Sequence, residues 1–470
     1  MLKSDIGIFG LGVMGQNLAL NLANNGYKVS VYNRTEDGEE KIIEDFMGTI
    51  TDKQKISGFT SVEDFVESLK SKKIILIMVV AGKVVDSVIE KLLPLLDNQD
   101  ILIDGGNSNY LDTAKRLNHL KNYNIDYLGC GISGGSEGAL KGPSMMPGGS
   151  QRAWKYLEKM FQDISAKDIN NKSCCQWMGV DGAGHFVKMV HNGIEYAIMQ
   201  VIVESYDLQK RLLRLNNNEI EENMSSWKNL ELNSFLLNIT CDLLLMEDEH
   251  GDNIVDTILD KSSQKGTGKD TVINSLKYGI PSSLISEAVN ARFISSFFKN
   301  RQELSEIYNS EIEFKGKKEL LLSDLYDAMY FSILLAYIQG FMLIEEFSKL
   351  NKWDIDLVNV IGSWKAGCII QSDMLYTLEE ALKDNLKESL FENNIFSKLF
   401  NSKETGLRNC VSTAILSGIP APVLTASVSF FDSIRSEKLP ANLIQAQRDF
   451  FGYHGFEKVG GQKGEVFHLS

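Results

Sequence analysis

The sequence has too little positive charge for a protein that binds polyanions. Of its 470 residues, 48 are Lys or Arg and 62 are Asp or Glu, which gives a formal net charge of -14. Because no basic face large enough to offset that charge is evident, we expect no nucleic-acid partner and no anionic membrane surface. An anionic substrate would therefore need a local basic pocket.

Cysteine is scarce and scattered. The six cysteines, at positions 130, 174, 175, 241, 368 and 410, form no CxxC pair and show no metal-ligand spacing. Neither a disulfide framework nor a metal site is therefore expected. Reduced thiols in the cytoplasm are the expected state.

Long hydrophobic runs are also missing. The longest uncharged stretch, 328–344, contains Ser332, Gln339 and Gly340. It is shorter than the roughly 20 residues that span a bilayer, so we interpret it as a core helix. The first residues, MLKSDIGIFG, enter a strand pattern at once and leave no room for a secretory signal. We expect a cytoplasmic protein with no membrane partner.

The chain is long enough for two or three domains. Over residues 1–180, apolar strand candidates alternate with helical patterns, the rhythm of a parallel sheet with crossover helices: IGIFG, VSVYN, IILIMVV, ILIDGGN and IDYLGCGIS. Residues 181–437 are dominated by helical periodicity, with helices expected at 184–212, 232–245, 318–350, 374–398 and 406–436. Residues 438–470 form a tail rich in glycine and aromatics, either loosely tethered or docked. The expected fold is a Rossmann-type α/β domain, a large all-α domain and a C-terminal tail.

A glycine motif stands at the first strand. Residues 10–15 read GLGVMG, between the strand DIGIF and the helical pattern QNLALNLANNG. In that context Gly10 permits a tight turn, Gly12 lets a pyrophosphate approach the backbone, and Gly15 lets helix and strand pack closely. We expect a dinucleotide to contact the whole turn, formed by Gly10, Leu11, Gly12, Val13, Met14 and Gly15. A purely structural turn is the alternative.

The second strand ends in Asn33, Arg34 and Thr35, where an NAD enzyme would place Asp or Glu. A carboxylate would repel a 2'-phosphate, whereas the Arg34 fork and the Thr35 hydroxyl could bind one. NADP is therefore favoured over NAD. Alternatively, Arg34 is an ordinary loop residue and Thr35 caps the acidic turn that follows.

A polar stripe interrupts the apolar segment 184–200, GHFVKMVHNGIEYAIMQ. At about 100° per residue, Lys188, His191, Asn192 and Glu195 project from one helical face. The other faces are apolar, which predicts a helix buried nearly all round. Burial would lower the pKa of the lysine and raise that of the glutamate, as a general base and a general acid require. An inert buried ion pair is the alternative.

Two glycine-rich turns follow predicted strands, DGGN at 104–107 and SGG at 133–135. They lie at the sheet edge where ligands bind, and their N–H groups could hold a carboxylate or phosphate. Each could also be a plain turn.

Several long segments, in this order along the chain, resemble the decarboxylating 6-phosphogluconate dehydrogenase family: GLGVMGQNL, NRT, DGGNS, SGGSEGALKGPSMMPGG, GAGHFVKMVHNGIEY, QKGTGK and RDFFGYHGFE. The resemblance runs from residue 6 to past residue 455. It implies a homodimer that converts 6-phosphogluconate and NADP to ribulose 5-phosphate, CO2 and NADPH, without a metal, in the pentose phosphate pathway and in gluconate utilisation. The tail would reach into the partner subunit's active site.

The resemblance also implies a role for individual residues. Lys188 would be the general base toward the 3-hydroxyl, and Glu195 the general acid toward C1. The sugar acid would be held by Asn107, Ser133, Gly134, Gly135, His191 and Asn192. Its phosphate would be held by Tyr196, Lys265, Thr267 and Arg292, and by Arg448 and His454 from the partner subunit. Further cofactor contacts would come from Val79, Val80, Ala81 and Asn107.

Some positions depart from the family pattern. Val80 stands where the family often has lysine, so one cofactor contact would be lost or replaced by backbone.

Two other functions compete. A smaller β-hydroxyacid dehydrogenase would leave QKGTGK, Arg292 and the tail unexplained. An NADPH-binding sensor without catalysis is disfavoured by the intact Lys188 and Glu195.

Overall fold

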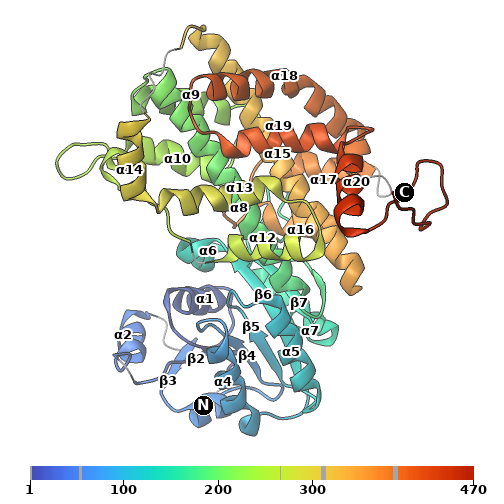
Figure 1. Cartoon of the computed structure of the whole chain (residues 1–470). Coiled ribbons are helices and arrows are strands. Elements are labelled where there is room, and N and C mark those ends of the chain that lie inside the picture. Colours follow the sequence, from blue (N-terminus) through green and yellow to red (C-terminus); the bar gives the residue numbers. More distant parts are fainter. Residues whose placement is uncertain are drawn as a thin grey trace.

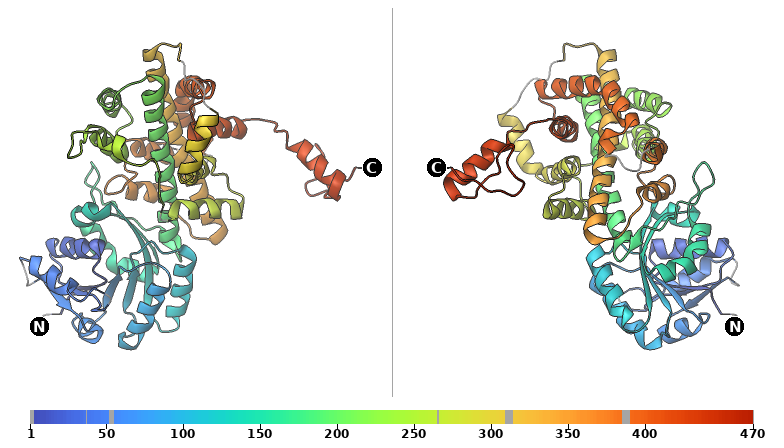
Figure 2. Two further views of the ribbon diagram at one scale, coloured as in Figure 1. Left: turned by 60° about the vertical axis from the view of Figure 1, so that its left-hand side comes forward. Right: turned by 90° about the vertical axis from the view of Figure 1, so that its right-hand side faces the viewer.

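A computed structural model describes residues 3–36, 38–51, 55–264, 266–308, 314–384 and 390–469. The chain folds into a strand-containing domain and a larger helical domain, which lie one above the other in Figure 1. The C-terminal segment projects sideways from the helical domain (Figure 2). This arrangement confirms the predicted fold class, a Rossmann-type α/β domain followed by a large all-α domain.

The first domain is built on one sheet of eight strands in the order β3-β2-β1-β4-β5-β6-β7-β8. The neighbouring strands are parallel except for the antiparallel pair β6–β7. The strands are β1 (Ile6–Phe9), β2 (Val29–Tyr32), β3 (Ile56–Phe59), β4 (Ile74–Ile77), β5 (Ile101–Asp104), β6 (Asp126–Ser133), β7 (Ser144–Gly149) and β8 (Gly179–Val180).

Five of these strands were predicted, and three were not. The sequence of β7, SMMPGG, contains proline and two glycines, which are unfavourable inside a strand. Six-residue pairing with β6 buries it completely, so tertiary context overrides its low strand propensity.

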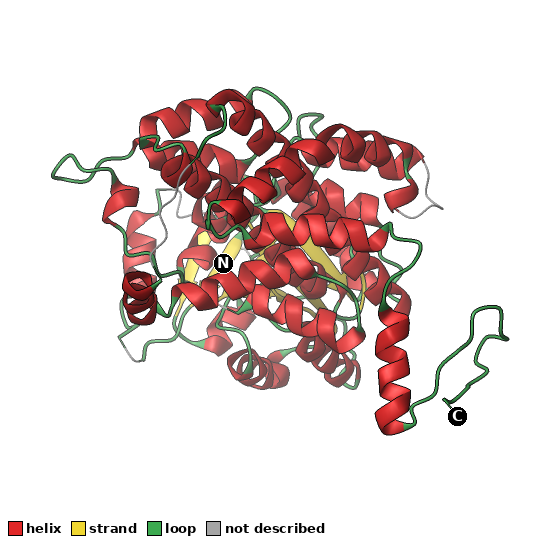
Figure 3. Ribbon diagram, turned by 45° about the horizontal axis from the view of Figure 1, so that its top comes forward, coloured by secondary structure: helices red, strands yellow, loops and turns green. Residues whose placement is uncertain are grey.

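Helices pack around the sheet, whose strands, in yellow, are largely hidden behind helices in Figure 3. Alternate strand side chains point to opposite faces, so each face has its own apolar cluster. The helices of this domain are α1 (Val13–Asn24), α2 (Ile42–Thr49), α3 (Val62–Glu67), α4 (Lys83–Leu92), the 3-10 helix η1 (Leu93–Leu95), α5 (Tyr110–Lys121), α6 (Gly135–Lys141) and α7 (Gln151–Ile164).

The second domain is built from helices joined by loops, and its described residues form isolated β-bridges but no strand. Its elements are α8 (Ala183–Asp207), the π-helix η2 (Leu208–Leu212), α9 (Asn217–Lys228), α10 (Phe235–Leu245), α11 (Ile254–Thr257), α12 (Thr267–Tyr278), α13 (Ser283–Ser295), α14 (Phe298–Ile307), α15 (Lys318–Asn351), α16 (Leu357–Trp364), α17 (Met374–Asp384), the 3-10 helix η3 (Leu390–Glu392), α18 (Asn394–Leu416), α19 (Pro422–Ile434) and α20 (Ala441–Gly452).

Two predicted helices were wrong as single elements. The segment 374–398 is divided, because a new helix starts at Asn394 with Asn393 as its N-cap. The segment 406–436 is divided between α18 and α19. Gly418 there has a positive φ of 67°, and Pro420 disfavours helical backbone in the residue before it.

Helix α15 is the core helix of this domain. Within the described residues it is the one helix long and apolar enough to cross a membrane by length and composition. Its most apolar window is 89% buried inside the protein, and its side chains join those of α8 and α18 in one large apolar cluster.

Helix α8 is seated directly on the sheet through glycines. A Cβ atom added at Gly184 would lie 2.4 Å from the Met146 carbonyl oxygen and 2.5 Å from that of Gly129. One added at Gly131 of β6 would lie 2.4 Å from the Cβ of Lys188. The absence of side chains at these positions therefore brings the polar stripe of α8 against the strands.

This seating predicts that Gly184→Ala destabilises the protein by about 2 kcal/mol or more, because the added methyl group meets rigid backbone. Urea unfolding measures the change. The matched control is Gly48→Ala on α2, where a Cβ meets nothing within 4 Å. It should leave stability unchanged or raise it by up to about 1 kcal/mol. Equal effects of the two substitutions would contradict the close seating.

Candidate active site

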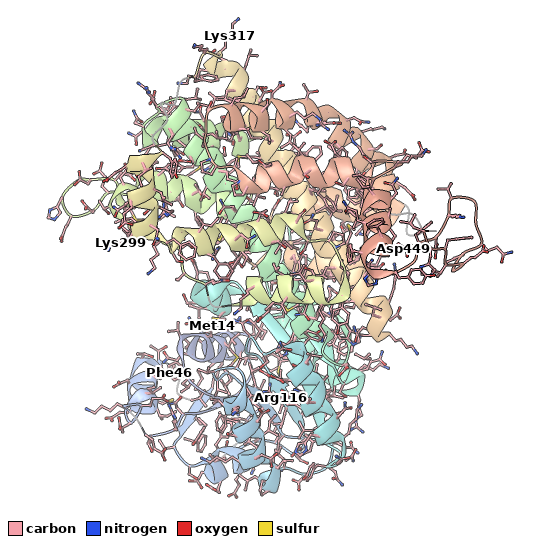
Figure 4. All side chains as sticks on the ribbon, viewed as in Figure 1. Met14, Phe46, Arg116, Lys299, Lys317 and Asp449 are labelled. Atoms are coloured by element: carbon pink, nitrogen blue, oxygen red, sulfur yellow. The ribbon has the colours of Figure 1, made fainter. Side chains whose placement is uncertain are left out.

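The glycine turn after β1 has the shape that a bound pyrophosphate needs. Gly10 has a φ of 104°, and a Cβ at Gly15 would lie 2.1 Å from the Gly10 carbonyl oxygen, so both positions require glycine for the protein's own packing. A Cβ at Gly12 would meet nothing within 4 Å. Gly12 is also the N-cap of α1 and offers no side-chain cap, so the positive end of the helix is left for an anion. Met14, in the first turn of α1, lies on the side of its domain nearest the helical domain (Figure 4).

The end of β2 is tied to that turn. Asn33 is buried, and its Oδ1 accepts a hydrogen bond from the Leu11 amide at 3.0 Å. Arg34 is half exposed and donates to Glu39 at 2.8 Å, which lowers the pKa of that carboxyl together with a bond from Asn33. Helix α2 begins only at Ile42, so the alternative that Thr35 caps this helix is wrong. Arg34 and Thr35 stand at the surface beside the glycine turn.

Helix α8 brings the four stripe residues together. Lys188 Nζ lies 3.5 Å from His191 Nδ1, and the same ring nitrogen lies 4.0 Å from Glu195 Oε2 and 3.1 Å from Asn192 Oδ1. The Lys188, His191 and Asn192 side chains are buried, and Glu195 is 22% exposed. One helical face therefore presents an amine, an amide and a carboxyl group, each within 4.0 Å of the His191 imidazole.

Burial shifts the pKa values of these groups toward their neutral forms. It lowers the pKa of Lys188 to about 8, although the Glu195 charge opposes this shift. It raises the pKa of Glu195, against the opposing charges of Lys188 and Arg292. Burial and the Lys188 charge hold the pKa of His191 well below its usual range. Both the amine and the carboxyl group are thus shifted in the directions expected from the sequence.

The two glycine-rich turns of the sheet meet this helical face. Ser133 Oγ lies 3.3 Å from His191 Nε2. At Gly134 a Cβ would lie 2.6 Å from the Gly367 carbonyl oxygen, whereas Gly135 faces open space. Asn107 shares a small cavity of about 30 Å³ with Lys188, Asn192 and Thr267. The turns after β5 and β6 thereby complete a polar chamber around the stripe.

A basic region adjoins the chamber. The Arg292 guanidinium of α13 stacks on the Tyr196 ring at 3.6 Å, and burial lowers the pKa of Arg292 although Tyr196 and Glu195 oppose it. Thr267 begins α12, whose next residue, Gly268, packs against Tyr196. Lys265 lies outside the described residues. Arg292 thereby supplies a local positive charge, which an anionic ligand needs on a chain of acidic composition.

Some predicted site residues lie elsewhere. Arg448 and His454 are exposed on the C-terminal segment, whose helix α20 stands apart from the body of the chain (Figure 2). Val79, Val80 and Ala81 follow β4, and Val80 is 76% exposed with no polar side chain to offer. The structure therefore gathers the α8 stripe, both glycine turns and Arg292, but not the tail.

Two buried residues near the chamber were not predicted. His185, three positions before Lys188, extends the stripe by one turn, so the same periodicity could have identified it. Its Nε2 is buried without a partner, and its ring lines the small cavity. Arg116 of α5 is buried beneath the DGGN turn, and no sequence pattern marks it. Within the described residues, no group of three or more His, Cys, Asp or Glu could hold a metal ion, and all six cysteines are free and buried.

Comparisons with known proteins cover both domains. The NAD binding domain of 6-phosphogluconate dehydrogenase matches residues 5–179, and the C-terminal domain of 6-phosphogluconate dehydrogenase matches residues 184–470. Relatives named 6-phosphogluconate dehydrogenase, decarboxylating, from Haemophilus influenzae and Homo sapiens are 44% and 42% identical. Both comparisons cover 100% of this chain, and 96% and 97% of the relatives.

A solved structure is also similar over the whole length. Plasmodium falciparum 6-phosphogluconate dehydrogenase, solved in its apo form and in complexes with NADP+ and with 6-phosphogluconate, has a TM-score of 0.95. It is 35% identical, and the similarity covers 99% of each chain.

The burial of Lys188 predicts a pH-dependent gain in stability for Lys188→Met. The amine has a pKa of about 8 in the folded chain against 10.5 as its ordinary value. The unfolded chain therefore binds this proton more tightly, and the cost of burial is fully present below pH 8 and disappears as pH rises toward 10.5. The variant should gain up to about 3 kcal/mol at pH 7 and progressively less above pH 8.

Urea unfolding of both proteins from pH 6.5 to 10 at one protein concentration measures this gain. The control is Lys299→Met, an exposed lysine on α14 (Figure 4), which should change stability by no more than about 0.5 kcal/mol at every pH. A loss of stability in Lys188→Met at pH 7 would show that the amine is not desolvated.

Proposed function

The chain belongs to the decarboxylating 6-phosphogluconate dehydrogenase family, and we propose that it oxidises and decarboxylates 6-phosphogluconate to ribulose 5-phosphate with NADP as cofactor. It is an oxidoreductase by this membership. We place the reaction in the pentose phosphate pathway and in gluconate utilisation, in the cytoplasm. The observation that carries the proposal is the buried stripe of α8, where Lys188 and Glu195 stand beside a low-pKa imidazole and two glycine-rich turns.

Each of the three parts of the chain has its own role in the proposed reaction. Residues 1–180 bind the cofactor, residues 181–437 bind substrate and form the dimer, and residues 438–470 reach the partner subunit. Bound NADP supplies a hydride acceptor. The turn of residues 10–15 would hold its pyrophosphate, Asn33, Arg34 and Thr35 its 2'-phosphate end, and Val79, Val80, Ala81 and Asn107 its nicotinamide end. The glycines and the uncapped start of α1 fit such a group, because Gly12 leaves open space at the helix N-terminus.

Lys188 is the general base of the oxidation. With a pKa of about 8, a useful fraction of the amine is neutral near pH 7. It takes the proton of the substrate 3-hydroxyl as C3 is oxidised, which gives a β-keto acid. The ketone then accepts the electron pair left by the departing carboxylate, and Lys188 returns its proton to the ketone oxygen. The ketone is thus the electron sink for decarboxylation, and no metal is required.

Glu195 is the general acid of the last step. Its raised pKa keeps the carboxyl group protonated to higher pH than an exposed glutamate. After CO2 has left, it donates its proton to C1 of the enediol and gives ribulose 5-phosphate. His191 stays neutral beside it and, with Asn192 and Ser133, provides hydrogen-bonding atoms for the substrate hydroxyl groups.

The sugar acid spans the chamber. Its carboxylate end meets Ser133, Gly134 and Gly135, and Asn107 lies between substrate and nicotinamide. Its phosphate meets Tyr196, Thr267 and Arg292, with Lys265 from outside the described residues. This need for a phosphate-binding group distinguishes the enzyme from a smaller β-hydroxyacid dehydrogenase, which has no use for a half-buried Arg292 stacked on Tyr196 at this place.

The tail acts in a homodimer. It is folded locally, because the buried carboxylate of Asp449 accepts hydrogen bonds from the Gly455 amide, the Leu469 amide and His468. Yet it exposes large aromatic side chains: Phe450 is 85% and Phe451 is 73% exposed. A folded unit with bare aromatics and with Arg448 and His454 exposed is suited to docking on a second copy of the chain, where these two residues complete the phosphate site.

The first test is NADP reduction with 6-phosphogluconate against gluconate, which lacks the phosphate. The phosphorylated acid should give NADPH and CO2, and gluconate little of either. Lys188→Met should form no NADPH even in the first turnover. Glu195→Gln should still form it in the first turnover and then lose about 100-fold or more in steady state, because its proton is needed only after CO2 leaves.

These results separate the alternatives. Equal turnover of gluconate would favour a β-hydroxyacid dehydrogenase. NADPH binding without any turnover of either acid would leave a sensor protein. A Lys188→Met variant that keeps its turnover would remove the proposed base.

The second test mixes two inactive variants, Lys188→Met and the double variant Arg448→Ala with His454→Ala. If the tail acts on the partner subunit, a mixed dimer has one intact site, and random reassociation should restore about a quarter of wild-type activity. Each variant reassociated with itself is the control. If the tail acts on its own subunit, the mixture should be no more active than the two variants apart.

A further inference from the structure

Arg116 lies buried where two loops of the strand domain meet. It belongs to α5, is 4% exposed, and lies in the strand-containing domain (Figure 4). Nothing in the steps described above uses it. A buried arginine carries a large desolvation cost, so its hydrogen-bond partners show what it holds in place.

The guanidinium binds in three directions. Its Nη1 donates to Asp104 Oδ2 at 3.1 Å and to Ser108 Oγ at 3.2 Å. Its Nη2 donates to the Gly82 carbonyl at 2.8 Å, and its Nε donates to Asp86 Oδ1 at 2.7 Å. Asp104 and Ser108 flank the DGGN turn, while Gly82 and Asp86 lie on the loop and helix that follow β4. One side chain therefore joins two loops that are distant in sequence.

Both loops carry residues of the proposed site. The first carries Asn107, which shares the small cavity with Lys188. The second loop contains Val79, Val80 and Ala81, the expected contacts to the nicotinamide end of NADP, and ends at Gly82. The two loops also meet at their strand ends, where the Gly105 amide donates to the Ile77 carbonyl at 3.0 Å. Arg116 adds a side-chain link beyond that backbone contact, reaching Ser108 on one side and Gly82 on the other.

The Asp104 carboxylate, beneath the DGGN turn, accepts hydrogen bonds at both of its oxygens. Asp104 is fully buried, and its Oδ2 also accepts from the Tyr127 hydroxyl at 3.1 Å. Its Oδ1 accepts from the Gly106 amide at 3.1 Å, inside the turn itself. Arg116 supplies the positive charge that such a buried carboxylate needs, so the shape of the turn depends on the guanidinium.

We propose that Arg116 is a positioning residue, which locks the Asn107 turn to the loop after β4 and so fixes the nicotinamide end of the cofactor against the substrate. The inference rests on the proposed function for its catalytic meaning, and on the four hydrogen bonds for its structural meaning. It acts through Asn107 and touches no reacting atom. Lysine cannot replace it, because a single ammonium group cannot reach partners that lie in three directions.

The variants are Arg116→Lys, which keeps the charge, and Arg116→Ala, which leaves space for a guanidinium ion. The matched control is Arg152→Lys, an arginine of α7 whose Nε donates to Asp126 at 2.8 Å; Asp126 begins β6 and pairs with Ile101, at the opposite end of the strands from both loops. Each is assayed for kcat, for the Michaelis constants of the sugar acid and of NADP, and for amide hydrogen exchange of residues 79–86 and 104–108.

We expect Arg116→Lys to lower kcat by about 100-fold, since a shift of about 1 Å in a positioned group has that effect. The Michaelis constant of the sugar acid should change less than about threefold, because Tyr196, Thr267 and Arg292 lie on other elements. Exchange should quicken in both loops together. Millimolar guanidinium chloride, below denaturing concentrations, should restore part of kcat in Arg116→Ala. Arg152→Lys should change none of these quantities.

Two results would overturn the proposal: a kcat of Arg116→Lys within twofold of wild type, or faster exchange across the whole domain with no recovery by guanidinium. The latter would leave Arg116 a general stabiliser. Wild-type protein is assayed in parallel. If it fails to reduce NADP, the proposed function is lost, while the exchange of the two loops still tests whether Arg116 holds them together.

Discussion

The packing of α8 on glycine positions of the strands is the constraint on which the rest of the structure depends. Glycines in β6, β7 and α8 allow backbone to lie against backbone, and so they exclude water from the helical face between them. Lys188 lies with its stem against Gly131 and its amine in the chamber beyond. Any side chain added at this contact would separate the two domains and admit solvent to the amine, which would return its pKa toward the ordinary value.

Desolvation acts on two groups of opposite charge, Lys188 and Glu195, and shifts the pKa of each toward its neutral form. A lysine and a glutamate on the same helical face would form an ordinary ion pair in water, with both groups charged. In the buried stripe the pKa of the amine falls and that of the carboxyl group rises, so each group is shifted toward its neutral form. The imidazole between them stays neutral for the same reason. The site therefore costs the fold stability, and the large apolar cluster around α15 compensates for that cost.

The parts of the site that depend on local spacing were predictable, and those that depend on distant contacts were not. The stripe from Lys188 to Glu195 follows from helical periodicity, and the turn from Gly10 to Gly15 follows from a motif within one strand–helix unit. Arg116 resembles any charged residue of an amphipathic helix until α5 packs beneath two loops. The strand β7 exists because β6 pairs with it, against its own composition. Pro420 indicates a break between α18 and α19 near Gly418, but the apolar periodicity on both sides predicts one continuous helix.

In the proposed homodimer, the tail would meet a geometric requirement that follows from the burial of the stripe. A chamber closed on every side would exclude its substrate as well as water. One side of the chamber therefore has to be closed by a separate segment. A terminal segment can close that side only if it keeps its shape before docking, because ordering a flexible chain would weaken binding. Asp449 meets this requirement by bonding α20 to the residues that follow it. The spacing of Arg448 and His454 is thereby set within the tail, and in the proposed homodimer docking would only have to place this pair beside Arg292.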